Sequence, residues 1–226
     1  DHIARVGGHT YAGTYGGGYY EVSSSLSLTA ISVPGITLQW GLWANNATGH
    51  LVAQTFSGVV DFDPVTGLST VIANVSGDGV SVSPNGATAY VAVSGGIASY
   101  SIPSGTPGFF ATTSGTADGT GVISGGSLNG YIVVVNNDGT VGLLDPTGAT
   151  YETIATGGTR GDFASADSLN GTLFMAFYEQ MYRLGIEGGT IGSELPEPAT
   201  ASVVALGLAA LAALRRRARG SVRASA

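Results

Sequence analysis

Short runs of β-branched and aromatic residues, separated by turn dipeptides, fill most of the chain before residue 193. Asn85-Gly86 and Asn129-Gly130 are two of these turns, and the apolar runs recur at intervals of about ten residues. Apolar and small residues alternate at 89–93, whereas 131–135 is apolar throughout, which is typical of a strand covered on both faces. One stretch of this kind predicts four successive strands, at 79–82, 88–93, 97–102 and 109–113.

The pattern repeats along the chain. Gly8-His9-Thr10-Tyr11 corresponds to Gly49-His50-Leu51-Val52, and the same place recurs at each later Asn-Gly. The landmark glycines are 41, 37, 44 and 41 residues apart: Gly8, Gly49, Gly86, Gly130 and Gly171. A proline-containing turn follows in step at 63–67, 102–105 and 145–148. Repeats of about 40–45 residues with four strands each are the sequence signature of a β-propeller.

The sequence therefore predicts an all-β fold, a β-propeller of about five four-stranded blades over residues 1–192. The first unit lacks most of its innermost strand, so either the ring has five blades or its N-terminal blades lie outside the chain. A sandwich or a parallel β-helix is the alternative, although the 41-residue period disfavours a sandwich and the absence of 20 to 25-residue coils disfavours a β-helix. The repeats resemble NHL, YVTN-type and gluconolactonase-like propellers, notably at Gly161-Asp162-Phe163, Asn170-Gly171-Thr172-Leu173-Phe174 and Met181-Tyr182-Arg183-Leu184.

The chain changes character after Glu197. Residues 199–214 are apolar and uncharged and would form a helix about 24 Å long, slightly short for a bilayer core of about 30 Å. Arg215, Arg216 and Arg217 follow at once, and the positive-inside rule places them in the cytoplasm and residues 1–198 across the membrane. We expect a linker at 193–198, a single transmembrane helix at 199–214 and a basic cytoplasmic tail at 215–226.

Pro196, Glu197 and Pro198 stand directly before this apolar segment. The order of Pro-Glu-Pro, apolar helix and arginine cluster resembles the PEP-CTERM protein-sorting domain of Gram-negative bacteria. The resemblance implies that an exosortase, a transpeptidase-like membrane enzyme, recognises the motif and removes the tail, while the prolines keep the motif out of a helix. A plain C-terminal membrane anchor is the alternative. Because no signal peptide opens the chain, we expect the numbering to start after a removed signal or inside a longer precursor.

Composition narrows the classes of partner. The chain has 15 acidic residues, eight arginines, no lysine and no cysteine, with a net charge of −7. Up to Glu197, three arginines against 15 acidic residues give −12, and the five arginines that follow give +5. An acidic propeller argues against nucleic acid as a partner, since phosphate is met by basic patches. The lack of cysteine excludes disulfides and thiolate metal sites.

Candidate catalytic groups are few. His2, His9 and His50 are the only histidines, and His9 and His50 occupy equivalent repeat positions, where a pair could bind a metal. No metalloprotease helix, nucleophile elbow or phosphate loop occurs, so no catalytic residue is assigned. Most aspartates are expected to form Asx turns, calcium at the ring centre or in a loop is the alternative, and no other cofactor is expected. These aspartates are Asp61, Asp63, Asp78, Asp118, Asp138, Asp145, Asp162 and Asp167.

Two further groups of residues bear on ligand binding. Arg160-Gly161-Asp162 is expected to form a blade-to-blade turn. Some aromatic side chains could stack on sugar rings or pack in the core: Tyr15, Tyr19, Tyr20, Trp40 and Trp43.

These observations favour an exported cell-surface or extracellular-matrix protein, held in the membrane as a precursor and sorted by an exosortase. The propeller would be a non-catalytic binding or structural module, with exopolysaccharide or another protein as its partner. The alternative is a metal-dependent hydrolase or lyase on a propeller scaffold. The gluconolactonase-like resemblance implies that alternative, because those enzymes hold a central metal with acidic and asparagine ligands.

Overall fold

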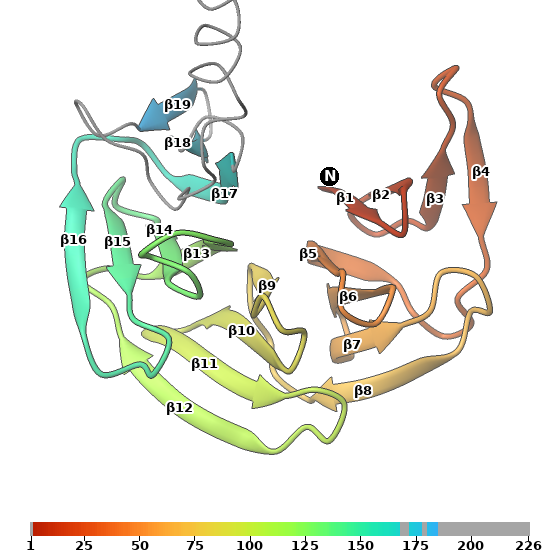
Figure 1. Ribbon diagram of the computed structural model, residues 1–226, viewed down its shortest axis with the longest axis horizontal. Helices are drawn as coiled ribbons and strands as arrows, with labels where there is room; N and C mark the ends of the chain where they lie inside the picture. The colour runs from red at the N-terminus through yellow and green to blue at the C-terminus, as the bar shows by residue number, and fades with distance from the viewer. Residues whose placement is uncertain (1, 168–171, 178–179, 185–226) are drawn as a thin grey trace, which may run out of the picture. The chain divides into compact units, whose positions relative to one another are not determined.

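The computed structural model describes residues 2–167, 172–177 and 180–184. All of them belong to one compact unit, Asp1–Ser193. They form five antiparallel sheets arranged around a common axis (Figure 1). Four sheets have four strands, and the fifth has three strands within the described residues. The predicted propeller of five blades is confirmed.

The first two blades contain strands β1 to β8. The strands of blade 1 are β1 (His2–Val6), β2 (His9–Gly13), β3 (Tyr19–Val22) and β4 (Leu28–Ile31). Those of blade 2 are β5 (Leu38–Asn45), β6 (His50–Thr55), β7 (Gly58–Phe62) and β8 (Ser69–Ala73).

The remaining three blades contain strands β9 to β19. Blade 3 has β9 (Val80–Val82), β10 (Thr88–Val93), β11 (Gly96–Ser101) and β12 (Pro107–Thr112). Blade 4 has β13 (Ala117–Val122), β14 (Ile132–Asn136), β15 (Val141–Leu144) and β16 (Tyr151–Ala155). Blade 5 has β17 (Gly161–Asp167), β18 (Thr172–Phe177) and β19 (Gln180–Leu184).

In every blade the strands pair in chain order, and the first strand lies nearest the axis (Figure 1). The innermost strands β1, β5, β9, β13 and β17 contact one another in sequence. The four strands predicted for the third repeat match β9 to β12 to within two residues at each end. The innermost strand of blade 1, expected to be largely missing, is present as β1.

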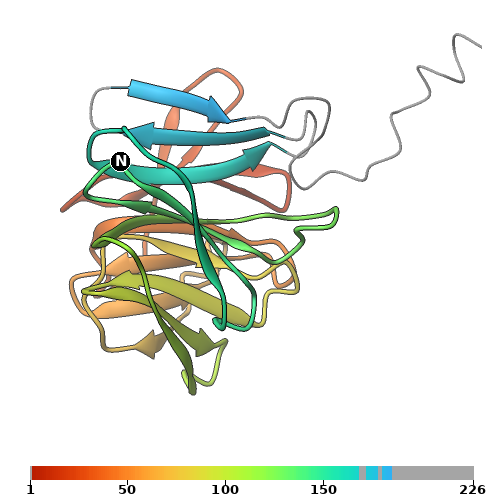
Figure 2. The same ribbon diagram turned by 90° about the vertical axis from the view of Figure 1, so that its left-hand side faces the viewer.

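The core consists of four apolar clusters, each lying between two consecutive blades. Alternation along a strand feeds two clusters at once, because successive side chains point to opposite faces of a sheet. On β6, Leu51 and Ala53 pack toward blade 1, whereas Val52 packs toward blade 3. Neighbouring sheets accordingly lie face to face (Figure 2). Among the described residues, none of the four clusters joins blade 5 to blade 1.

The Asx-turn prediction is confirmed for three aspartates in hairpin loops. Asp63 accepts hydrogen bonds from the Val65 backbone N–H at 2.8 Å and the Thr66 hydroxyl at 2.7 Å, and Asp138 and Asp145 cap their turns in the same way. These bonds to the ionised form lower the pKa of each of the three carboxyls. The prediction is wrong for Asp61, Asp118 and Asp162, which lie within strands: Asp61 continues β7 between Val60 and Phe62, and Asp118 and Asp162 are bulge residues of β13 and β17. Asp167 is the last residue of β17.

The expected linker, transmembrane helix and basic tail, with Pro196, Glu197, Pro198 and the arginine cluster, lie outside the described residues. In the part of the chain that the structure describes, no helix is long and apolar enough to cross a membrane.

Candidate functional site at the channel mouth

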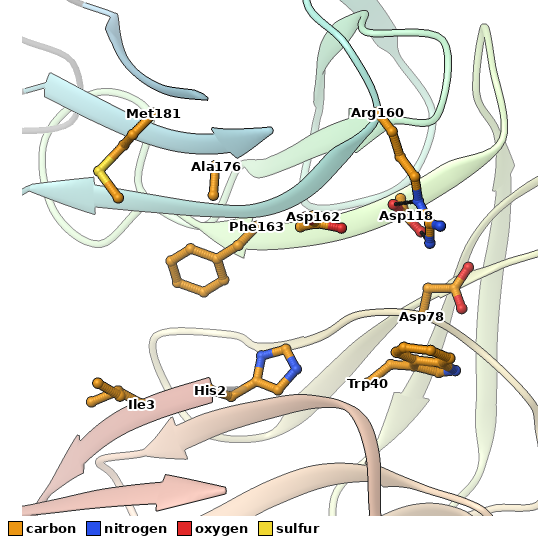
Figure 3. Close-up of a pocket in the computed structure, with 10 residues that line it drawn as sticks. All are labelled: His2, Ile3, Trp40, Asp78, Asp118, Arg160, Asp162, Phe163, Ala176 and Met181. Atoms are coloured by element: carbon orange, nitrogen blue, oxygen red, sulfur yellow. Dashed lines mark hydrogen bonds and ion pairs between the residues drawn. The ribbon is translucent and has the colours of Figure 1, made fainter. Parts of the chain in front are cut away.

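A cavity of about 610 Å³ lies beside the first residues of the innermost strands and extends between blades 5 and 1, where Phe163 and Met181 lie opposite His2 and Ile3 (Figure 3). We call this region the channel mouth. Figure 3 shows Arg160, Asp118, Asp78 and Trp40 on one side and Ile3, Phe163, Ala176 and Met181 on the other, with His2 and Asp162 between them. The lining residues are His2, Ile3, Trp40, Asp78, Asp118, Arg160, Asp162, Phe163, Ala176 and Met181.

Irregular strand pairing places the acidic side chains here. On β13, Ala117 pairs with Asn136 and Gly119 with Val135, so Asp118 is an extra residue without a partner. Asp162 is the equivalent extra residue on β17, and the β5–β6 register shifts across Trp40. A β-bulge turns the extra residue out of the regular alternation. A side chain that would otherwise enter an apolar blade interface is thereby directed toward the channel mouth.

Glycines beside the bulges bring the innermost strands close together. A Cβ atom added to Gly79 would lie 2.9 Å from the backbone oxygen of Asp118 and 3.0 Å from the backbone nitrogen of Thr120. A Cβ at Gly119 would collide in the same way with the backbone of Asp162 in blade 5. Only glycine permits this approach. The close approach crowds the acidic residues of blades 3, 4 and 5 around one opening.

Arg160 and Asp118 form a two-pronged ion pair. Arg160 Nε donates to Asp118 Oδ2 at 2.8 Å, and Nη2 donates to Oδ1 at 3.0 Å. The Asp118 side chain is only 3% exposed, whereas that of Arg160 is half exposed. The hydrogen bonds and charge of Asp118 raise the pKa of the Arg160 guanidinium. Both carboxylate oxygens of Asp118 are therefore engaged by one cation.

Asp78 lies beside this ion pair. Burial, the charge of Asp118 and a hydrogen bond to Asp118 raise the pKa of Asp78 to about 6, although Arg160 opposes the shift. Burial and the charge of Asp118 also raise the pKa of Asp162. Burial lowers the pKa of His2 to about 4, so its ring is neutral at pH 7. With three carboxylates and one guanidinium, the channel mouth carries an excess of negative charge.

Exposed aromatic rings extend from the channel mouth over blades 1 and 2. Tyr15 stacks on Trp40 with 4.4 Å between ring centroids, and Phe56 lies 5.9 Å from Tyr15. Tyr15 is 52% exposed, Trp40 is 37% exposed and Phe56 is 57% exposed. We call them the aromatic platform. Tyr19, by contrast, is buried in the core against Phe62.

Thr120 lies beneath the aspartates, in a narrow space that shares Trp40, Asp162 and Phe163 with the larger cavity. Its side chain is 2% exposed, and its hydroxyl oxygen has no hydrogen-bond partner within the described residues. Buried hydroxyls are rarely left without a partner. Within the described residues this hydroxyl is therefore an unsatisfied group, and Thr120 lines a space of about 10 Å³ that holds about one water-sized group.

The expected histidine pair is not brought together as a metal site. His9 bonds through Nδ1 to Glu21 at 2.5 Å, and His50 bonds through Nδ1 to Asp61 at 3.1 Å, each within its own blade. The described residues contain no group of three or more His, Asp or Glu side chains placed to hold a metal ion.

The donor set at the channel mouth likewise does not fit the central metal that gluconolactonase-like propellers hold. Both oxygens of Asp118 are bound to Arg160, and burial together with the charge of Asp118 raises the pKa of the neighbouring Asp78. A guanidinium occupies the place where a cation would neutralise these carboxylates. We therefore derive no metal-dependent step at this site.

Sequence reasoning named most of the channel-mouth residues but did not assemble them. Arg160 ends the connection from blade 4, as the predicted blade-to-blade turn requires, whereas Gly161 and Asp162 already begin β17. Asp78-Gly79 and Asp118-Gly119 are 40 residues apart, and Asp162 follows Asp118 by 44. These spacings match the repeat, so a search for aspartates at the repeat period would have found the three.

Comparisons with known proteins identify the fold. No protein-family model matches the chain, and no curated protein matches it. Solved structures do match. A chain of the nidogen/laminin complex matches at a TM-score of 0.67 and 9% identity, and the match covers 80% of this chain and 74% of that chain. A gluconolactonase from Xanthomonas campestris matches at 0.62 and 16% identity, over 78% and 68% of the two chains.

A third solved structure, the Swd1 β-propeller domain of Myceliophteria thermophila, matches at a TM-score of 0.57 and 11% identity, over 79% of this chain and 66% of that one. At such low identity these similarities show the fold alone. The chain thus has the β-propeller fold of these solved structures.

Proposed function

We propose that this protein is an exported cell-surface or extracellular-matrix protein whose propeller binds glycan at the channel mouth without catalysing a reaction. In this proposal an exosortase-type enzyme sorts the precursor through Pro196, Glu197 and Pro198, and residues 199–214 hold it in the membrane beforehand. The observation that carries the binding function is the cavity, which combines carboxylate oxygens with exposed aromatic faces.

Sugars suit this combination of groups. Their hydroxyls donate hydrogen bonds, and ionised carboxylates such as that of Asp162 accept them. The C–H faces of sugar rings are apolar and pack on flat aromatic side chains such as Trp40. The cavity volume of about 610 Å³ lies within the range of about 300–1,000 Å³ usual for small-molecule sites.

The non-catalytic assignment is supported by the state of the acidic groups. A hydrolase needs a free general base or a metal-bound water. Asp118 is bound on both oxygens by Arg160, which leaves only Asp78 and Asp162 as candidate bases, and the described residues contain no group of three or more His, Asp or Glu placed to hold a metal. A hydrolase or lyase would instead reveal itself by shortened or unsaturated glycan products in the binding assay described next.

Binding is tested with the full-length chain, purified in detergent, on an array of neutral, acidic and amine-bearing polysaccharides. Trp40→Ala is expected to weaken glycan binding about tenfold or more, because it removes the aromatic face next to the carboxylates. Phe110→Ala is the matched control, since Phe110 is an exposed ring on the outer strand β12. Absence of binding to every glycan, or equal losses in both variants, would refute the proposed glycan site.

Sorting is tested separately, by expressing the full-length precursor in bacteria with and without an exosortase. We expect the tail to be removed only when the enzyme is present, and Glu197→Ala to block that removal. Glu194→Ala, three residues upstream of Glu197, is the control and should be processed normally. Processing that ignores the enzyme or the Glu197 change would contradict sorting and would leave a plain anchor.

A further inference from the structure

The charges at the channel mouth are not balanced within the described part of the chain. Arg160 is committed to Asp118 by two hydrogen bonds. Asp78 lies beside another acid, and within the described residues Asp162 makes no direct hydrogen bond or ion pair, although the charges of Arg160 and the N-terminal amine lower its pKa. In the part of the chain that the structure describes, Asp78 and Asp162 therefore have no directly bonded cation, and both face the same cavity (Figure 3).

Thr120 supplies an independent observation. Its buried hydroxyl has no partner among the described residues, and Thr120 lines a space of about 10 Å³ that shares His2, Trp40, Asp162 and Phe163 with the cavity. A buried hydroxyl left unsatisfied costs about 1–3 kcal/mol, and a hydrogen-bond donor entering from above would remove that cost. Because a hydroxyl oxygen can accept as well as donate, it complements the N–H groups of an ammonium.

Aromatic rings flank the same carboxylates. Trp40 and Phe163 both line the cavity and its narrow extension. The face of an aromatic ring attracts a cation, most strongly when water is excluded. Carboxylates, aromatic faces and an acceptor hydroxyl together favour a positively charged group that also offers several N–H donors.

We propose that the ligand of the channel mouth is a glycan with free amino groups, one protonated amine lying among Asp78, Asp162 and the Thr120 hydroxyl. This inference rests on the proposed glycan-binding function and names the chemical class of its ligand. The aromatic platform of Tyr15, Trp40 and Phe56 then carries the neighbouring sugar rings of the strand.

Other ligands fit less well. An acidic glycan would bring carboxylates next to Asp78 and Asp162, and like charges repel at this range. A neutral glycan would satisfy hydrogen bonds but leave the excess charge in place. A lysine-rich peptide offers ammonium groups, but a thin side chain would leave much of a cavity of about 610 Å³ empty.

Titration calorimetry on the full-length chain separates these ligands. The probes are glucosamine hexamer, N-acetylglucosamine hexamer, an oligogalacturonate and hexalysine, tested just above pH 6 and at low salt. The first two share one sugar backbone, and N-acetylation removes the amine charge while adding an amide and a methyl group; we expect the amine form to bind about tenfold tighter or more. That preference should weaken as salt rises, because the charge term is screened.

Two variants and one control locate the effect. Asp162→Asn removes one charge without changing shape and should abolish most of the amine preference, and Thr120→Val should weaken binding of the amine form severalfold. Glu152→Gln removes the same charge from the exposed outer strand β16 and should change nothing. Circular dichroism and thermal melts verify that each variant is folded.

Each outcome decides something. Equal or tighter binding of the N-acetylated hexamer would overturn the inference while leaving the glycan-binding function standing. Tighter binding of hexalysine would overturn it in favour of a cationic peptide. An equal loss in Glu152→Gln would show a diffuse charge effect and also overturn it. Failure of all three glycans to bind would instead remove the proposed function itself.

Discussion

Replacing Asp78 by asparagine should stabilise the protein at neutral pH. In the folded state burial, the charge of Asp118 and their shared hydrogen bond raise the pKa of Asp78 from 3.8 to about 6. The folded chain therefore keeps this proton at pH values where the unfolded chain has released it. Asparagine cannot ionise, and its amide can still donate a hydrogen bond to Asp118.

The direction and size of the effect follow from linkage. Below about pH 4 the carboxyl is protonated in both states, and the acid costs nothing relative to asparagine. Between about pH 4 and 6 only the unfolded state loses its proton, so the free energy of unfolding falls as pH rises. A shift of about two pH units corresponds to about 3 kcal/mol at most. Since the side chain is only partly buried, solvent screening reduces this to about 1–2 kcal/mol.

Urea unfolding of the full-length wild type and of Asp78→Asn, at about pH 4 and about pH 7.5, measures this difference. The two chains should be about equally stable at the lower pH, and the variant about 1–2 kcal/mol more stable at the higher pH. The pKa values of Asp63, Asp138 and Asp145 are lowered, so these residues stabilise the protein less as pH falls, but their contribution is the same in both chains. A difference that is the same at both pH values, or a variant less stable at pH 7.5, would refute the assigned pKa.

Three further substitutions test the ion pair, the close approach of blades and the contact between blades 2 and 3. Arg160→Met should destabilise the protein by about 1–2 kcal/mol at pH 7 and less in acid, because it leaves the buried Asp118 unpaired; pH-dependent urea unfolding measures this. Gly79→Ala should cost about 1–3 kcal/mol in urea unfolding, since its Cβ would press on the neighbouring backbone; a neutral result would contradict the close approach. Asn45→Ala should lower the melting temperature by a few degrees, because the Asn45 amide donates to the Gly86 carbonyl at 3.0 Å across the blade boundary; an unchanged melt would show that this bond contributes nothing.

The architecture could be predicted because its signals are local and repeated. Strand length, turn dipeptides and the repeat of about 41 residues are all visible in the sequence, and β10 (Thr88–Val93) has the predicted limits. Burial in the core could be predicted as well: the continuous apolar run at 131–135 was expected to be covered on both faces, and every residue of β14 (Ile132–Asn136) is buried.

The site could not be predicted in the same way, because it depends on irregularities. A bulge changes which way one residue points without changing the composition of the strand, so Asp118 and Asp162 looked like turn residues. The ion pair joins residues 42 positions apart in different blades, and no short motif encodes it. The aromatic platform also required structure, because Tyr15 and Tyr19 lie four residues apart, yet one is exposed and the other buried.

The acidic residues of the channel mouth oppose the stability of the fold that carries them. The fold does not require an acidic residue at the irregular position of an innermost strand, because blade 2 has Trp40 there. Blades 3, 4 and 5 instead bring three carboxylates around one opening with a single guanidinium. Burial and the charge of Asp118 raise the pKa of Asp78 and Asp162, and these shifts weaken folding at neutral pH. Such a cost is typical of a functional site. If these carboxylates lower the stability of the fold but bind a cationic ligand, Asp78→Asn should be more stable than the wild type at pH 7.5 and should also bind the glucosamine hexamer more weakly. A gain in stability with unchanged binding would place the ligand elsewhere on the propeller.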